Sequence, residues 1–198
     1  MGYALAEIAF LHGAEVILVS GPVTIKCSEG IKKIDVESAE EMFEVATSYF
    51  GYCDIAILSA AVADYTPAKK IKGKLKKEQI GDNSTLELSK TKDILKELGS
   101  LRNDSQILVG FALESNNLIE YAKEKLKKKN CDIIVANYAN KENSGFGGDY
   151  NTISIIDKHD KFTDYLPMTK IDCAEAIIKY IVEYSTNARV RKSISETC

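Results

Sequence analysis

The chain has little of what marks several common protein classes. Among its 198 residues there is no tryptophan, and there are only two histidines and three prolines. Its five cysteines are odd in number and widely spaced, without a Cys-x-x-Cys pair, so neither a zinc site nor a disulfide framework is expected. No apolar run approaches the roughly 18 residues that a membrane helix needs, and the start lacks the basic lead-in of a signal peptide. We therefore expect free thiols in a reducing, cytoplasmic setting.

The net charge and the length further limit the class of protein and the number of domains. Lysine and arginine number 26 against 29 acidic residues, and this net charge of −3 argues against general nucleic-acid binding. A hydrophobic fraction of 45% suffices for one sizeable core. We expect a single domain over residues 1–184, followed by a polar tail over 185–198.

Short apolar segments alternate along the chain with amphipathic ones. This order predicts a three-layer α/β/α fold around a mostly parallel, Rossmann-like sheet. A C-terminal antiparallel hairpin is expected around His159 and Asp160, and Gly99 is expected to follow the end of a short helix. The expected strands are 15–20, 31–36, 53–59, 85–89, 106–111, 132–136, 151–156 and 161–166, and the expected helices are 3–11, 38–50, 91–98, 115–129 and 171–184.

The carboxyl ends of the expected parallel strands form one rim, where ligands of such sheets bind. The segments there are 20–22, 59–64, 110–114 and 136–140, which combine small residues with a carboxylate, an aromatic ring and an amide. These groups suit a nucleotide pocket, although small residues at strand ends can also serve only to let loops pack tightly.

A glycine-rich phosphate turn is missing from the chain. Doubly wound nucleotide-binding folds normally open with a strand and such a turn, but here the first segment is already helical. Neither GxGxxG nor GxxxxGK[ST] occurs. Either the fold lacks this element or the chain starts after it.

A lysine-rich segment follows Asp64. Residues 65–77 hold six lysines, with Pro67 and Gly73 as breakers of regular structure. Beside the expected rim, such a segment could close over phosphates as a lid, because lysine delivers a point charge on a long stem. A solvated basic loop is the alternative.

Six motifs in order carry a family resemblance. They are AAVADY (60–65), GKLKK (73–77), KTKDIL (90–95), GFALE (110–114), DIIVAN (132–137) and FGGDYN (146–151). From Met1 to about Tyr184 the chain resembles the phosphopantothenate–cysteine ligase domain, often the C-terminal half of a bifunctional bacterial protein with a decarboxylase domain. AAVADY resembles the bacterial CTP-using branch.

The resemblance implies an activity. Such enzymes join 4′-phosphopantothenate to cysteine in coenzyme A biosynthesis, through an acyl-cytidylate formed from CTP with loss of pyrophosphate. Mg²⁺ is expected with the triphosphate, and the family tends to form homodimers. Lys74 matches a catalytic lysine on a mobile loop, whose charge could stabilise the α-phosphate as the substrate carboxylate attacks.

The resemblance also implies nucleotide-binding positions, while metal ligands stay unassigned. Lys92 stands where the family usually has proline, which leaves its role less defined. The implied positions are Leu58, Ser59, Ala60, Asp64, Lys74, Lys92, Asp93, Ile94, Leu95, Phe111, Lys125 and Lys129.

For Lys125 and Lys129, helical geometry favours a different role. Both lie on or beside the apolar row of the 115–129 helix, and Lys129 would sit on the order of 20 Å from the rim along the axis. Snorkelling over the sheet is the expectation from geometry alone.

The chain departs from the family pattern at its start. Members normally begin with a strand, a Gly-Gly-Thr turn and a segment ending Ser-Ser-Gly-Lys-Met-Gly, of which only Met1 and Gly2 are present. The resemblance implies that the absent segment supplies an edge of the sheet, part of the phosphate pocket and an asparagine that handles the acyl-cytidylate. We therefore expect these 198 residues alone to lack ligase activity.

Two other classes stay open. A Rossmann-type NAD(P)-binding oxidoreductase would use a Tyr-x-x-x-Lys pair, and Tyr121 and Lys125 have that spacing, but GxGxxG is absent. A non-catalytic nucleotide-binding module is the second.

Overall fold

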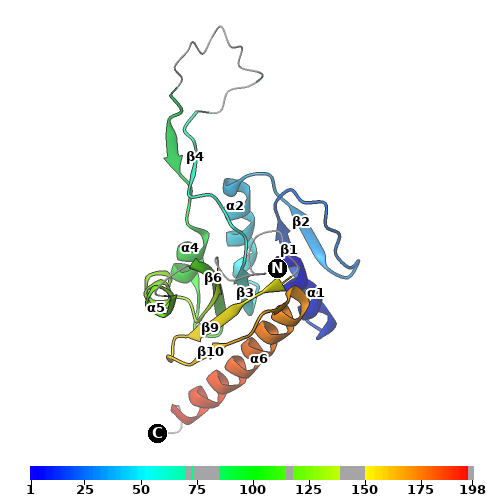
Figure 1. Ribbon diagram of the computed structural model, residues 1–198, viewed down its shortest axis with the longest axis vertical. Coiled ribbons are helices and arrows are strands. Elements are labelled where there is room, and N and C mark those ends of the chain that lie inside the picture. Colours follow the sequence, from blue (N-terminus) through cyan, green and yellow to red (C-terminus); the bar gives the residue numbers. More distant parts are fainter. Residues whose placement is uncertain (70–72, 74–84, 115–117, 139–149, 196–198) are drawn as a thin grey trace.

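The computed structural model describes residues 1–69, 73, 85–114, 118–138 and 150–195 (Figure 1). The predicted Lys74, most of the lysine-rich segment and the FGGD part of the last motif lie outside these residues.

A five-stranded sheet in the order β10-β9-β7-β6-β3 forms the centre of the fold. Strands β3, β6 and β7 are parallel, whereas β9 and β10 continue the sheet antiparallel as a hairpin around the predicted turn. The predicted mostly parallel sheet with a C-terminal hairpin is therefore confirmed. The strands are β3 (Ile55–Leu58), β6 (Ile107–Glu114), β7 (Ile133–Tyr138), β9 (Ile153–Asp157) and β10 (Phe162–Asp164).

Helices cover both faces of the sheet, as the three-layer prediction requires. On one face α1 (Gly2–Leu11) and α6 (Lys170–Ser195) pack against alternate strand residues such as Val109 and Val135. On the other face lie α2 (Ala39–Phe50), α4 (Ile94–Leu101) and α5 (Leu118–Lys129), against Leu108, Ile134 and Ile156. Because successive strand residues point to opposite faces, the continuous apolar runs of β6 and β7 bury both sides.

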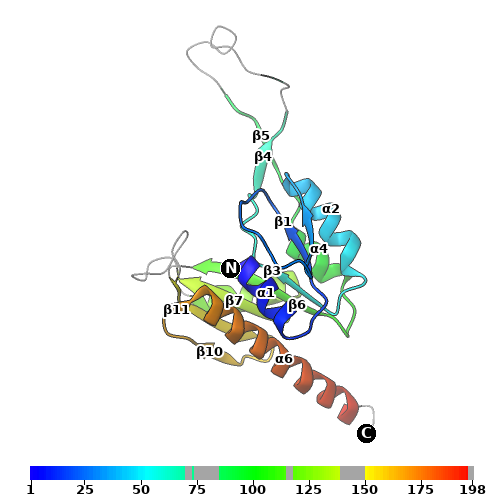
Figure 2. The ribbon, with the colours of Figure 1, turned by 90° about the vertical axis from the view of Figure 1, so that its right-hand side faces the viewer.

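Three two-stranded sheets lie outside the central one. Strands β1 (Ile17–Ser20) and β2 (Lys32–Asp35) pair in parallel, and β8 (Tyr150–Asn151) pairs with β11 (Met168–Thr169). Strands β4 (Tyr65–Pro67) and β5 (Leu88–Lys90) form an arm that projects from the body (Figures 1 and 2).

The arm corrects one expectation, because residues 65–67 were predicted as the start of a loop. They form a strand since residues 88–90 offer an antiparallel partner about twenty positions further along, which no local pattern reveals.

Local signals placed several helix ends correctly. Ser38 caps α2, accepting from the backbone N–H of Glu41 at 3.2 Å, and Glu41 accepts from the N–H of Glu37 at 2.8 Å. The Ser38 bond is the half of the capping box that the Ser-x-x-Glu spacing predicted, while the N–H of Glu37 belongs to the residue before the N-cap.

Two helices run further than predicted. Helix α4 continues past Gly99 to Leu101. The glycine therefore does not end the helix; it leaves room for the carbonyl oxygen of Lys129, with which a side chain at this position would collide. Helix α6 continues to Ser195, beyond the predicted end at Tyr184. No helix within the described ranges is long and apolar enough to cross a membrane.

Candidate functional site

The rim begins at the carboxyl end of β3. Leu58, its last residue, pairs with Gly110 of β6 and packs partly buried against the apolar cluster below α2 and α4. Ser59 follows at the end of the strand, and Ala60 is exposed. The three positions expected from the resemblance therefore lie together where parallel strands offer backbone groups to a ligand.

Two hydrogen bonds join the loop after β3 to the segment before α4. The backbone N–H of Thr91 donates to the carbonyl of Asp64 at 2.9 Å, and the Thr91 hydroxyl donates to the carbonyl of Ala63 at 2.7 Å. Asp64 itself is exposed. These bonds bring the backbone of Asp64 next to the segment that leads into α4, and Thr91, for which no role was expected, makes the link.

Helix α4 begins at this point of the rim. Asp93 is its N-cap, accepting from the N–H of Lys96 at 3.0 Å. The side chains of Ile94 and Leu95 are buried among core residues, and Leu95 packs on Gly110. Any contact of Ile94 or Leu95 with a ligand must therefore use the backbone, where the first N–H groups of a helix favour anions.

Lysines from α5 reach this helix start. Lys129 forms an ion pair with Asp93, and Lys125 donates to the carbonyl of Phe111 at 2.7 Å. The Lys125 contact agrees with the snorkelling expected from geometry. Lys129 does more, since it brings two predicted nucleotide-binding residues from different helices together.

Close packing of α4 against α5 explains how Lys129 reaches the rim. A Cβ at Gly99 would lie 1.9 Å from the Lys129 carbonyl oxygen, so the two backbones touch there. Asp93 is then six residues, or about 9 Å, up the α4 axis. The lysine side chain spans much of that distance.

Lys129 and Lys125 both lower the pKa of Asp93. Burial is the largest single influence and by itself raises this pKa. The hydrogen bonds from Lys129 and from the N–H of Lys96, with the charges of Lys129 and Lys125, together outweigh it, so the pKa is lowered. The carboxylate is therefore held charged beside two ammonium groups.

Lys92 points to a different partner. Its ammonium lies 2.6 Å from Glu40 and 4.6 Å from the centre of the Phe43 ring, both on α2. The Glu40 hydrogen bond raises the pKa of Lys92. In this arrangement the side chain ties the start of α4 to α2, whereas the ligand rim lies at Asp64 and Asp93.

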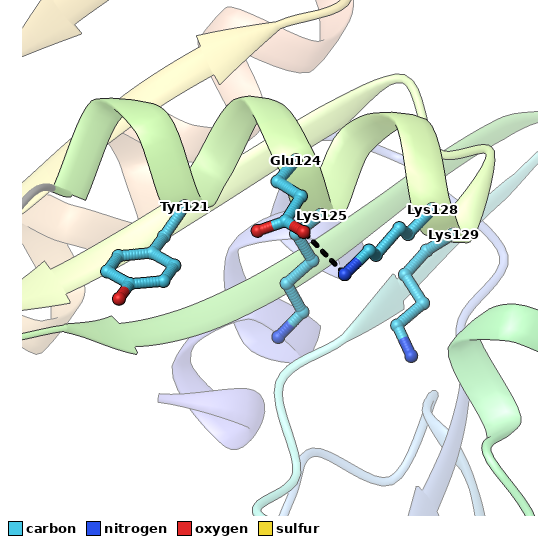
Figure 3. A pocket seen from close by; sticks show the side chains of 5 residues that line it. All are labelled: Tyr121, Glu124, Lys125, Lys128 and Lys129. Carbon is cyan, nitrogen blue, oxygen red and sulfur yellow. Dashed lines mark ion pairs between the residues drawn. The ribbon is translucent and has the colours of Figure 1, made fainter.

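A pocket lies along one side of α5 (Figure 3). Tyr121, Glu124, Lys125, Lys128 and Lys129 line it. Lys128 pairs with Glu124, while Lys125 and Lys129 extend to the same side of the helix (Figure 3). Of the three lysines that line the pocket, Lys128 thus forms an outward pair with Glu124, whereas the inward Lys125 and Lys129 reach β6 and the start of α4.

A second charged cluster, at the opposite end of the sheet, was not anticipated. Asp132 is 1% exposed and accepts from Arg102 at 2.6 Å, from Lys158 at 2.7 Å and from the N–H of Leu108 at 2.9 Å. The Tyr184 hydroxyl donates to it at 3.2 Å. The sequence signal that could have indicated this cluster is the position of Asp132, a carboxylate directly before the apolar strand β7. This cluster ties α4, β6, the hairpin and α6 together, away from the rim.

Other expectations have mixed outcomes. The thiols of Cys27, Cys53, Cys131 and Cys173 are free, as predicted, and Cys198 lies outside the described residues. Lys74 lies outside them as well, so its predicted role stays a prediction.

A three-layer α/β domain of this kind belongs to the broad class of proteins with a mostly parallel sheet, in which ligands bind at the carboxyl ends of the strands. More narrowly, the chain belongs to the family described as the DNA/pantothenate metabolism flavoprotein C-terminal domain, whose model matches residues 1–184.

Known relatives are consistent with this assignment. The chain is 45% identical over 186 residues to the coenzyme A biosynthesis bifunctional protein CoaBC of Bacillus subtilis, covering 93% of this chain and 45% of that protein. It is also 45% identical over 183 residues to a cysteine/cysteine sulfinic acid decarboxylase of an unknown prokaryote, covering 92% of this chain and 50% of that protein. The chain thus spans about half the length of the curated relatives it matches.

Among solved structures, the C-terminal domain of a coenzyme A biosynthesis bifunctional protein CoaBC matches with a TM-score of 0.77 and 38% identity. The match covers 94% of this chain and 84% of that domain.

Proposed function

We propose that this domain joins 4′-phosphopantothenate to cysteine, with CTP as the activating nucleotide, in the cytoplasmic synthesis of coenzyme A. The observation that carries the proposal is the meeting of Asp93 with Lys129 at the start of α4, beside Asp64 and the end of β3. Family membership and the CoaBC relatives support the same reaction.

The reaction has two steps. A carboxylate oxygen of 4′-phosphopantothenate attacks the α-phosphorus of CTP, and the bond to pyrophosphate breaks. The amine of cysteine then attacks the acyl carbon, CMP leaves with the bonding electron pair, and an amide forms. Both steps move negative charge onto phosphate oxygens, so fixed positive groups accelerate them.

The described residues suit phosphate binding. Lys125 and Lys129 supply two ammonium groups, and the first N–H groups of α4 face the same region. Lys129 exchanges its partner, from the Asp93 carboxylate to a phosphate, as the nucleotide enters. The exposed Asp64 carboxylate is placed to accept from a ribose hydroxyl, and Lys74 is assigned to the α-phosphate from the lysine-rich segment.

Mg²⁺ would enter with the triphosphate. No three His, Cys, Asp or Glu side chains converge on a metal position within the described ranges. A metal would therefore be held mainly by phosphate oxygens and water, as Mg²⁺ commonly is, and Asp64 would offer an exposed carboxylate of the rim. Its chemistry would be neutralisation of phosphate charge.

The test measures pyrophosphate release from CTP with 4′-phosphopantothenate, with and without cysteine. It uses the chain alone and the chain extended at Met1 by the corresponding segment of the Bacillus subtilis relative. We expect release that requires 4′-phosphopantothenate but not cysteine, and greater activity in the extended protein. Release that is independent of 4′-phosphopantothenate would exclude the ligase.

The Lys74→Ala variant of the extended protein should lose at least about a hundredfold in acylation rate, in the range found for a single electrostatic donor. Lys179→Ala, which removes an exposed lysine of α6, is the matched control. Equal rates in both variants would remove Lys74 from the mechanism. A homodimer, expected from the resemblance, is checked by sedimentation equilibrium of the same samples.

A further inference from the structure

Three consecutive residues lead from the arm into α4, and each is bonded to a different part of the fold. Thr91 donates its backbone N–H to the carbonyl of Asp64 at 2.9 Å. Asp93 caps α4 and pairs with Lys129 of α5. Lys92, between them, points to α2. The segment 91–93 therefore joins the loop after β3, α2 and α5 at the point where α4 begins.

Helix α2 holds the Lys92 side chain through two contacts. The ammonium lies 2.6 Å from Glu40 and 4.6 Å from the centre of the Phe43 ring, and these two residues are three positions apart on one face of the helix. Phe43 in turn packs, partly buried, against the apolar cluster that contains Leu98 of α4. Because a carboxylate and the face of an aromatic ring both attract a cation, the two contacts hold the ammonium between α2 and α4.

The surroundings of Lys92 are acidic. The hydrogen bond to Glu40 is the largest cause of its raised pKa; burial opposes this effect, and the charges of Glu40, Glu44 and Glu97 add to it. Glu40 and Glu44 lie one turn apart on α2, and Glu97 lies in the first turn of α4. Without the lysine, these carboxylates would repel one another across the contact between α2 and α4. A cation at position 92 therefore favours the close approach of the two helices.

The first turn of α4 is the part of the helix that this bridge supports. Asp93 accepts there from the N–H of Lys96 at 3.0 Å. The first N–H groups of a helix lack carbonyl partners within it and favour anions. A movement of this turn would shift those groups together with the pair of Asp93 and Lys129. The position of α4 therefore bears directly on any phosphate that binds at the rim.

Glu40 distinguishes two roles for Lys92. If the ammonium binds a phosphate of the nucleotide, Glu40 competes for it, and loss of the Glu40 charge should tighten binding. If the ammonium holds α4 in place, Glu40 is its necessary partner, and loss of the charge should weaken binding. The geometry favours the second role, since the ammonium already has two partners on α2.

We propose that Lys92 is a positioning residue, which bridges the start of α4 to Glu40 and Phe43 of α2 and so holds the first turn of α4 where the nucleotide binds. Lys92 thereby contributes to nucleotide binding through α4 and not through contact with a phosphate. The part of the inference that concerns CTP rests on the proposed function, whereas the bridge itself rests on contacts between described residues.

The test compares Lys92→Met, Glu40→Gln and the double variant with the parent chain. Lys92→Met keeps the stem of the side chain and removes its charge. Lys92→Arg, whose guanidinium can make both contacts, tests for rescue. Glu44→Gln removes a negative charge one turn further along α2 and is the matched control for Glu40→Gln.

Two measurements are made on each protein. Amide hydrogen exchange at Thr91 and Lys96 reports on the segment before α4 and on its first turn, with the buried Ile155 of β9 as the internal reference. Titration calorimetry with CTP and Mg²⁺ gives the dissociation constant. The exchange measurement needs no nucleotide, so it stands or falls separately from the proposed function.

We expect Lys92→Met and Glu40→Gln each to speed exchange at Lys96 about two- to fivefold and to weaken CTP binding by a similar factor, the range for a half-exposed ion pair. The double variant should be no worse than either single variant, because all three lack the same bridge. Lys92→Arg should restore most of the loss, and Glu44→Gln should stay within about twofold of the parent.

Tighter CTP binding by Glu40→Gln than by Glu44→Gln would show that Glu40 competes for Lys92, and would overturn the proposal in favour of direct phosphate contact. Unchanged exchange in Lys92→Met would overturn the bridge. Faster exchange with unchanged CTP affinity would overturn its part in binding. A parent chain that binds no CTP would contradict the proposed function, while the exchange would still decide whether the bridge positions α4.

Discussion

Asp132 and Asp93 are both aspartates held by basic side chains, at opposite ends of the same three-layer fold. The Asp132 side chain is 2% exposed and has Arg102 and Lys158 as charged partners, with a tyrosine hydroxyl and a backbone N–H in addition. The Asp93 side chain is 43% exposed and has Lys129, itself 24% exposed, and one backbone N–H.

The difference in burial indicates that the Asp132 cluster and the Asp93–Lys129 pair have different roles. Every oxygen position of a buried carboxylate must be satisfied, and removing it strands the opposite charges in the interior. A half-exposed pair contributes little to stability and can exchange partners at small cost. The Asp132 cluster therefore holds α4, β6, the hairpin and α6 together. In the Asp93–Lys129 pair, the lysine can instead bind an incoming phosphate.

The largest expected effect is at Asp132. Asp132→Ala leaves Arg102 without its buried partner and should lower the free energy of unfolding by about 3–5 kcal/mol. Asp104→Ala, in an exposed loop, is the control and should change it by less than about 0.5 kcal/mol. Urea denaturation measures the free energy of unfolding of both variants. Equal values for Asp132→Ala and Asp104→Ala would contradict the structural role of the Asp132 cluster.

Gly99 tests the packing that brings the rim pair together. Gly99→Ala forces its Cβ to 1.9 Å from the Lys129 carbonyl oxygen, so α4 and α5 must separate. We expect a loss of about 1–3 kcal/mol in the free energy of unfolding, as for other overpacked contacts. Gly51→Ala meets no atom within 4 Å and should be near neutral, which thermal unfolding would verify.

Lys129 tests the functional side of the comparison. Lys129→Met keeps the stem but removes the charge, and should weaken CTP binding about tenfold, or roughly 1.4 kcal/mol. Lys128→Met, which loses only the outward pair with Glu124, should bind CTP like the parent. Titration calorimetry distinguishes them. If the two variants bind equally well, the inward lysines are not phosphate ligands.

The smallest effect concerns the pH dependence of the rim pair. Because the pKa of Asp93 is lowered in the fold, its stabilisation is present above the ordinary value of 3.8 and is lost as the pH falls through the lowered pKa. Asp93→Asn keeps an N-cap but removes the charge. Its deficit in unfolding free energy, less than about 1 kcal/mol at neutral pH because water screens the pair, should vanish in acid.

That deficit is measured by urea denaturation from neutral to acid pH, with Asp104→Asn as the control. A deficit that is constant over the whole range would show that the Asp93 charge adds nothing to the fold.

Local patterns predicted most elements of the fold. Helices α1, α2 and α5 and strands β1, β3, β6 and β7 lie where apolar periodicity and the Ser38 cap placed them. Strand β4 was missed because its only support is β5, some twenty residues away. The end of α4 was misplaced because Gly99 signals a stop locally, although its role is to let α5 approach.

The candidate site divides in the same way. Motif order indicated the family and the rim segments, and the family is confirmed. Helical geometry placed Lys129 far from the rim, and it could not anticipate that α4 presents Asp93 to it. Motif position likewise listed Lys92 with the nucleotide-binding residues, which stays a prediction, and it could not anticipate that the ammonium lies against Glu40 and Phe43.

The sequence by itself determined the alternation of strands and helices and the capping of α2, since each depends on neighbours a few residues apart. Only the tertiary structure decided that Asp93 meets Lys129 and that Asp132 collects four partners. Those features depend on how whole helices and strands pack, and residues distant in the chain carry no local record of which of them will touch.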